Sequence, residues 1–148
     1  MVKATIVYSG DLHCVATHEP SQAQITTDAP VDNHGKGESF SPTDLVGTAL
    51  GTCMATVMGI YARQKNVELS GLRIEVAKEM SVSGPRRIAR LSSEIWLPEA
   101  TAASPHMDTA EARMALERAA LTCPVHQSLS VDIDRPVTFH WPNKLKSE

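Results

Sequence analysis

The chain has 148 residues, of which 42% are hydrophobic and 21% charged, with a formal net charge of −3 and a pI of about 6.1. This composition is typical of a globular protein, and the length suits one domain over residues 1–148. The weak acidity argues against a nucleic-acid partner or an anionic membrane surface. The start, MVKATIVYSG, lacks the apolar segment of a secretory signal. No apolar run approaches the roughly 20 residues that span a bilayer, so we expect a cytoplasmic protein without a membrane partner.

The first part of the chain predicts a three-stranded antiparallel meander. Apolar and polar side chains alternate over three segments, which turn-forming sequences separate, and these segments are residues 2–9, 12–18 and 23–27. A polar loop with two glycines around Lys36, residues 29–40, then leads into the next element.

The longest helical pattern covers Ser41–Lys65. Ser41 is a suitable N-cap, Pro42 suits the first helical position, and Asp44 completes a capping box. Apolar side chains recur at spacings of three and four and predict one buried stripe: Val46, Ala49, Leu50, Cys53, Val57 and Ile60. Because the helix is also rich in Gly and Thr, it needs tertiary support, and it is the predicted centre of the fold.

The second half predicts a hairpin, a helix and a last strand. Alternation over residues 72–82 and 89–97 flanks a Ser-Gly-Pro turn. After a loop at 98–106, a helix capped by Asp108 runs to about Thr122, and a strand at 131–141 contains Pro136, which suggests a break. The predicted order is β-β-β-α-β-β-α-β. This is an α+β fold with a mostly antiparallel sheet packed on the central helix.

The three cysteines are Cys14, Cys53 and Cys123. Their odd number and the absence of a CxxC pair argue against a disulfide scaffold and a zinc site, and we expect no metal or cofactor. Cys53 and Cys123 both fall on inward stripes of helices, so they can meet. A buried free cysteine is most often a core residue. If one is reactive, Cys123 is as plausible as Cys53, because Pro124 makes Cys123 a candidate N-cap, where a thiolate is favoured.

Two motifs, SPTDLVGTALGTC and TCPVHQSL, followed by Phe139 and Trp141 in the closing strand, resemble the OsmC/Ohr family of osmotically induced and organic-hydroperoxide-resistance proteins. The resemblance covers nearly the whole chain. It implies an intertwined homodimer with active sites at the subunit interface, and a thiol peroxidase that reduces organic hydroperoxides in oxidative-stress defence. It assigns the peroxidatic role to Cys53 and the resolving role to Cys123. An external dithiol, often protein-bound lipoate in the family, would reduce the resulting disulfide.

The chain also departs from the family pattern. The family supports its reactive cysteine with an Arg from the N-terminal part and a Glu, whereas here no Arg precedes Arg63 and Thr43 occupies the Glu position. Asp44 points to the side of the helix opposite Cys53, so a cap explains it better. A second hypothesis is therefore a non-catalytic OsmC-like dimer that binds a small apolar ligand against the small residues of the helix. His126 is either a base beside Cys123 or, as we prefer, a half-exposed surface histidine.

Overall fold

The computed structural model describes residues 1–142. The chain divides into two compact units, Met1–Val46 and Gly47–Glu148, and each is described by itself. The expectation of one domain over residues 1–148 stays a prediction, and its last six positions, 143–148, lie outside the described residues.

The first unit contains the predicted meander. Strands β1 (Ala4–Gly10), β2 (His13–His18) and β3 (Gln24–Asp28) pair antiparallel in that order. A short 3-10 turn, η1 (Val31–Asn33), follows in the polar loop. The turn between β1 and β2 depends on Gly10, which adopts a φ of 90°, a value that favours glycine. The sequence pattern therefore predicted these three strands correctly.

Asp28 ties the polar loop to the sheet. Its side chain is 4% exposed and bonds with the His13 imidazole on the neighbouring strand. The other carboxylate oxygen accepts a hydrogen bond of 2.9 Å from the backbone N–H of Glu38. The His13 hydrogen bond holds the pKa of Asp28 below its usual value. Lys36 is 59% exposed and pairs with Asp11 at 3.4 Å, as expected of a loop lysine.

The central helix α1 (Pro42–Gln64) begins with the predicted capping box. The backbone N–H of Asp44 donates to Ser41 Oγ at 3.1 Å, and the backbone N–H of Ser41 donates to the Asp44 carboxylate at 2.8 Å. The two bonds satisfy N–H groups that have no partner within the helix. The role of Asp44 as a cap is thereby confirmed.

The predicted buried stripe of α1 is largely wrong. Of the six predicted residues only Leu50 is buried, whereas Ala49 and Ile60 are exposed. The buried residues are Gly47, Leu50, Gly51, Met54, Met58 and Ala62. The reason is that two glycines let the helix approach the sheet. A Cβ at Gly51 would lie 3.1 Å from Val76, so large aliphatic side chains are excluded from the line of closest approach.

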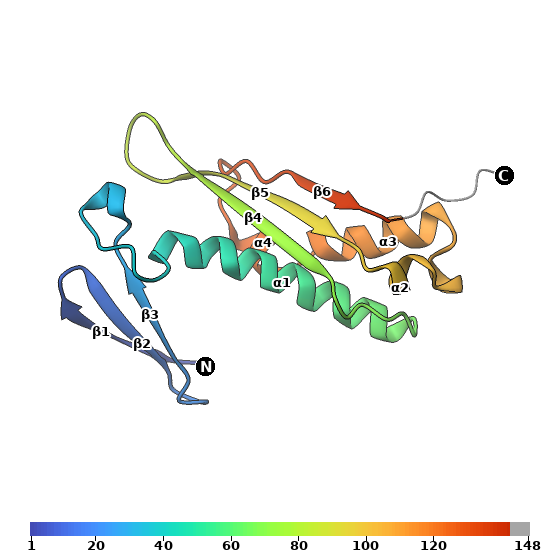
Figure 1. Cartoon of the computed structure of the whole chain (residues 1–148), viewed down its shortest axis with the longest axis horizontal. Coiled ribbons are helices and arrows are strands. Elements are labelled where there is room, and N and C mark those ends of the chain that lie inside the picture. The colour runs from blue at the N-terminus through green and yellow to red at the C-terminus, as the bar shows by residue number, and fades with distance from the viewer. Residues whose placement is uncertain (143–148) are drawn as a thin grey trace. The chain divides into compact units, whose positions relative to one another are not determined.

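The second unit contains a sheet of three strands, β4 (Arg73–Met80), β5 (Ile88–Trp96) and β6 (Val137–His140). β4 and β5 form the predicted hairpin, whereas β6 pairs parallel to β5. Figure 1 shows α1 lying along β4 and β5. The last strand begins at Val137 rather than at residue 131, because Pro136 precedes it and cannot donate to the ladder.

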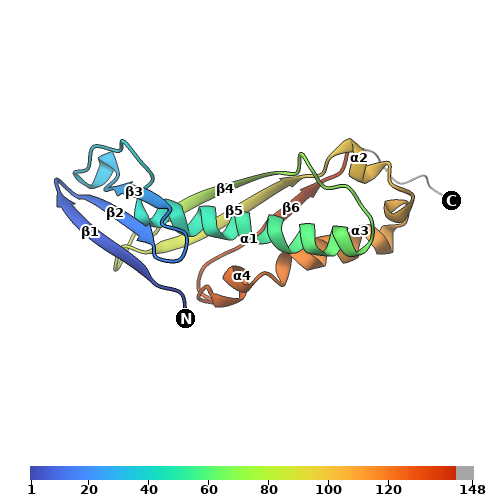
Figure 2. The ribbon, with the colours of Figure 1, turned by 90° about the horizontal axis from the view of Figure 1, so that it is seen from below.

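Four helical segments follow β5 before β6 is reached. The predicted loop at 98–106 contains α2 (Glu99–Ala102) and the 3-10 helix η2 (Pro105–Met107). Helix α3 (Ala110–Leu121) is capped by the Thr109 hydroxyl, which accepts from Ala112 N–H at 3.2 Å, so Asp108 is not its cap. A short α4 (Pro124–Ser128) follows. In Figure 2, α3 and α4 lie beside α1.

Helix α3 buries Leu116 and Ala120, and also Arg113, which the hydrophobic pattern did not predict. The guanidinium of Arg113 lies 4.4 Å from the centre of the Trp141 ring, and its Nε donates to the carbonyl of Met107 at 3.0 Å. Stacking on an aromatic face and a hydrogen bond together make burial of this cation tolerable.

The elements and their order confirm an α+β fold with a mostly antiparallel sheet. Among the described residues, α1 also meets the length and hydropathy criteria for a membrane span, with a mean hydropathy of 1.5. The expectation that no apolar run approaches the length of a membrane span did not foresee this. The core helix of a globular domain meets the same criteria, and α1 packs one face on β4 and β5.

Candidate functional site

Cys123 lies at the junction of α3 and α4. It is fully buried, and its backbone angles are extended while Pro124 opens α4. The thiol accepts a hydrogen bond of 3.3 Å from the backbone N–H of His126 and so acts as the N-cap of α4. The N-cap position predicted from the Cys-Pro pair is therefore confirmed, and it holds the sulfur in one orientation.

Cys53 comes from the middle of α1 and is partly exposed. At about 100° per residue it lies about 60° round the helix from the buried Leu50, so it faces the flank of α1 rather than the sheet. On that flank the thiol lies close enough to the Cys123 thiol to raise the pKa of Cys123. The tertiary structure thus brings together the two helical cysteines, one accessible and one enclosed, while Cys14 lies in β2 of the other unit.

The two thiols differ in their surroundings. Burial raises the pKa of Cys123, and the nearby Cys53 thiol adds to this effect. The backbone N–H groups of His126 and Val125 act in the opposite direction but do not outweigh burial. A buried thiol with a raised pKa is a poor first nucleophile, because the thiolate is the reactive form. The alternative that Cys123 attacks first is therefore disfavoured.

His126 follows Cys123 by three positions and is half-buried. Burial lowers the pKa of His126, and the positive charge of Arg135 lowers it further. Arg135 also holds the backbone of this turn, because its guanidinium donates to the carbonyl of His126 at 2.5 Å and to that of Leu129 at 3.4 Å. Sequence reasoning named His126 but missed Arg135, since no local motif connects an arginine before β6 with α4.

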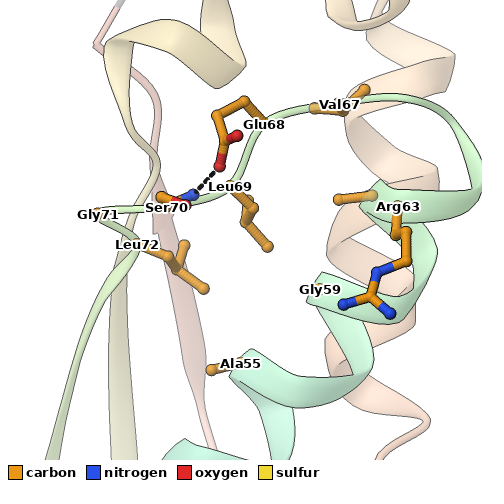
Figure 3. Close-up of a pocket in the computed structure, with 10 residues that line it drawn as sticks. Ala55, Gly59, Arg63, Val67, Glu68, Leu69, Ser70, Gly71 and Leu72 are labelled. Atoms are coloured by element: carbon orange, nitrogen blue, oxygen red, sulfur yellow. Dashed lines mark hydrogen bonds between the residues drawn. The ribbon is translucent and has the colours of Figure 1, made fainter.

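A cavity of about 490 Å³ opens beside the second half of α1. Figure 3 shows Ala55 and Gly59 on the helix side of this cavity and Leu69 and Leu72 on the opposite side, with the Arg63 side chain at its edge. The remaining lining residues are Ala62, Val67, Glu68, Ser70 and Gly71. The lining is short-chained on the helix side and branched aliphatic on the loop side, which suits an apolar ligand with one anionic or polar end.

A second cavity of about 350 Å³ adjoins the first through Gly59 and Arg63. Its other lining residues, Thr56, Ile60 and Gln64, lie three, seven and eleven positions after Cys53. These spacings place them on the same side of α1 as the thiol. Cys53 therefore lies on the side of α1 that lines the second, largely apolar cavity.

The residues described by the structure contain no cluster of three His, Cys, Asp or Glu side chains that could hold a metal ion. The oxygen atoms of Ser41 and Thr43 lie 3.1 Å apart within the helix cap. The position of the family glutamate thus belongs to the start of α1, and its neighbour Asp44 is engaged in the cap.

Comparison with known proteins identifies relatives over nearly the whole chain. A family model described as OsmC-like protein matches residues 35–135. A Psychrobacter arcticus 273-4 protein named for an osmotic stress induced and detoxification response shares 39% identity, with a TM-score of 0.83 over 95% of this chain and 96% of that one. No protein of curated function matches the sequence.

Two more distant structures share the fold. The organic hydroperoxide resistance protein OsmC of Legionella pneumophila is 11% identical, with a TM-score of 0.72 over 95% of this chain and 96% of that one. The organic hydroperoxide resistance protein OhrB of Bacillus subtilis is 16% identical, with a TM-score of 0.64 over 94% of this chain and 97% of that one.

Proposed function

Since the chain belongs to the OsmC-like protein family, we propose that it is a thiol peroxidase that reduces organic hydroperoxides in oxidative-stress defence. Two distant structural relatives carry the name of organic hydroperoxide resistance. The observation that carries the proposal is the contact between a partly exposed thiol on α1 and a buried thiol at the N-cap of α4. A peroxidase that works through a disulfide requires such a pair.

Cys53 is the peroxidatic residue in this proposal, because an incoming peroxide can reach it. Its thiolate attacks the terminal oxygen of ROOH, the O–O bond breaks, and the alkoxide leaves and takes up a proton as ROH. The sulfur is oxidised to a sulfenic acid. Cys123 then attacks that sulfur, the S–O bond breaks, and the two cysteines form a disulfide while water departs.

The cycle closes when an external dithiol reduces the disulfide by thiol–disulfide exchange, which returns two thiols and leaves the reductant oxidised. Cys123 is fully buried, so we propose that the reductant attacks the partly exposed sulfur of Cys53 first. Protein-bound lipoate, the family's frequent reductant, is the dithiol to test, against free dithiothreitol as a reference. No cofactor within the chain takes part in this scheme.

The test is intact-mass spectrometry after one equivalent of an organic hydroperoxide, followed by peptide mapping. The expected result is the loss of two hydrogens and a linked peptide pair that contains Cys53 and Cys123. The control is Cys53→Ser, which should leave the peroxide unconsumed. Unmodified thiols in the wild type, or oxidation of Cys14 alone, would reject the proposal.

We also propose a homodimer. Two regions expose apolar side chains: Ile60 of α1 is 55% exposed, and Ile6, Tyr8 and Ile25 of the first sheet are between 52% and 62% exposed. A second copy of the chain would remove this surface from water. Light scattering coupled to size-exclusion chromatography should give twice the mass of one chain, and a monomer at micromolar concentration would exclude the stable dimer.

The cavity beside α1 supports a second candidate function, a binding module for a small apolar ligand. Its aliphatic loop side and small helix side fit such a molecule. An environment-sensitive apolar fluorophore should bind the wild type and lose affinity in Ala55→Leu, which fills the cavity. Gln64→Leu, which changes only the adjoining cavity, is the control. Sustained peroxide turnover with a dithiol would exclude the purely binding role.

A further inference from the structure

The resolving step of the proposed cycle requires an acceptor for the proton of the Cys123 thiol. Cys123 must lose its thiol proton before its sulfur can attack the oxidised Cys53. Yet this thiol is fully buried, and burial keeps its pKa above the ordinary value. At neutral pH the thiolate is therefore scarce, and a nearby proton acceptor would accelerate the step.

His126 is placed to be that acceptor. It is the third residue of α4, and a side chain at this position reaches back over the N-cap, as in a capping box. Its backbone nitrogen lies 3.3 Å from the Cys123 sulfur. Its ring atom Nδ1 is enclosed, and within residues 1–142 it has no hydrogen-bond partner. A buried imidazole nitrogen without a partner is costly in a native structure and calls for an explanation.

The surroundings keep this imidazole neutral and in place. The charge that acts on it is that of Arg135, while the Cys123 thiol lies beside the His126 backbone N–H and Cys53 of α1 lies next to Cys123. Because burial and Arg135 lower the pKa of His126, the ring is unprotonated at neutral pH and has an acceptor lone pair. Arg135 fixes the backbone of the turn by its bond to the His126 carbonyl.

We propose that His126 is the general base of the resolving step, an inference that rests on the proposed function of the two cysteines. The imidazole takes the proton from Cys123. The Cys123 sulfur then forms the S–S bond to Cys53 as the S–O bond breaks, and the departing hydroxide takes the proton back from the imidazolium as water. No other oxidant or reductant enters this step. In the resting protein Nδ1 does not bond the thiol; catalytic hydrogen bonds often tighten only in the reacting complex.

The experiment isolates the attack of Cys123 without any peroxide. In a Cys14→Ser background, Cys53 is converted with 5,5′-dithiobis(2-nitrobenzoate) to its mixed disulfide with thionitrobenzoate. Attack by Cys123 then releases the coloured thiolate in a single turnover. In His126→Asn this release should be at least about 100-fold slower at pH 7 than in the parent, the lower end of what a general base contributes. His106→Asn, at an exposed histidine of η2, is the matched control and should leave the rate unchanged.

The pH profile separates a base from a packing residue. Release in the parent should change little between about pH 7 and 9, whereas in His126→Asn it should rise about tenfold per pH unit, following the thiolate of Cys123. Because the parent profile is measured without a substitution, it tests the proposal even if His126→Asn folds poorly. Equal rates and equal profiles in both proteins would overturn the role of His126.

The outcomes also distinguish this proposal from the proposed function. If release is fast and depends on His126 but the protein consumes no hydroperoxide, the base role stands and the peroxidase fails. If hydroperoxide is consumed and release is independent of His126, the peroxidase stands and the base role fails. If Cys123 displaces no thionitrobenzoate, both the resolving role and its base are overturned.

Discussion

Replacement by alanine should stabilise the protein at Gly47 but not at Gly51, the two glycines on the buried face of α1. A Cβ at Gly47 would meet Val76 at 3.5 Å and Leu91 at 3.6 Å, which are ordinary contacts. A Cβ at Gly51 would lie 3.1 Å from Val76, closer than most real contacts of this kind. Because Val76 belongs to the β4–β5 ladder, its backbone cannot yield freely at Gly51.

The magnitudes follow from two opposing effects. Replacing a glycine inside a helix with alanine gains about 1 kcal/mol, which Gly47→Ala should keep. Overpacking a core costs about 1–3 kcal/mol, so Gly51→Ala should be neutral or destabilised by up to about 2 kcal/mol. The difference between the variants is then about 1–3 kcal/mol, and each kcal/mol corresponds to about 2–4 °C in the melting temperature of a chain of this size.

The assay is urea unfolding followed by tryptophan fluorescence. Both variants and the wild type are compared at one protein concentration, because the stability of a dimer depends on concentration. Gly51→Ala should have a lower midpoint than Gly47→Ala with an unchanged slope. If Gly51→Ala raised the midpoint as much as Gly47→Ala, the close approach of α1 to β4 would be refuted.

Three further results are expected. In Cys123→Ser, hydroperoxide should oxidise Cys53 to sulfenic acid that a dimedone probe traps, and excess peroxide should drive it to sulfinic acid because no thiol resolves it; a stable thiol at Cys53 would contradict this. Gly59→Ala, where a Cβ meets nothing within 4 Å, should stabilise the protein by about 1 kcal/mol, and a loss of stability would show that another chain or molecule covers this face. The pKa of Asp28 is lowered in the fold by His13, so the stability that its ionised form contributes is complete above the unfolded-state pKa and is lost as the pH falls through the folded value. Unfolding curves between pH 7 and 3 should therefore show a smaller loss in Asp28→Asn than in the wild type, and identical losses would contradict the assignment.

The candidate site was only partly visible in the sequence. The Cys-Pro pair predicted the N-cap at Cys123, because a cap is a local arrangement that a few neighbouring residues determine. The capping box of Ser41 and Asp44 was predicted for the same reason. By contrast, the burial of His126 Nδ1 and the bond from Arg135 to the His126 carbonyl depend on how the chain returns from α4 to β6.

The sequence by itself determined the order and type of the principal elements and the caps of α1 and α4, because alternation, helical period and cap chemistry act over a few residues. Only the tertiary structure decided which side of α1 is buried, since glycines rather than large aliphatic residues lie where the helix meets β4 and β5. It also decided the parallel pairing of β6 and the proximity of Cys53 to Cys123. These features depend on contacts between segments far apart in the chain, where packing and close approach outweigh the local pattern.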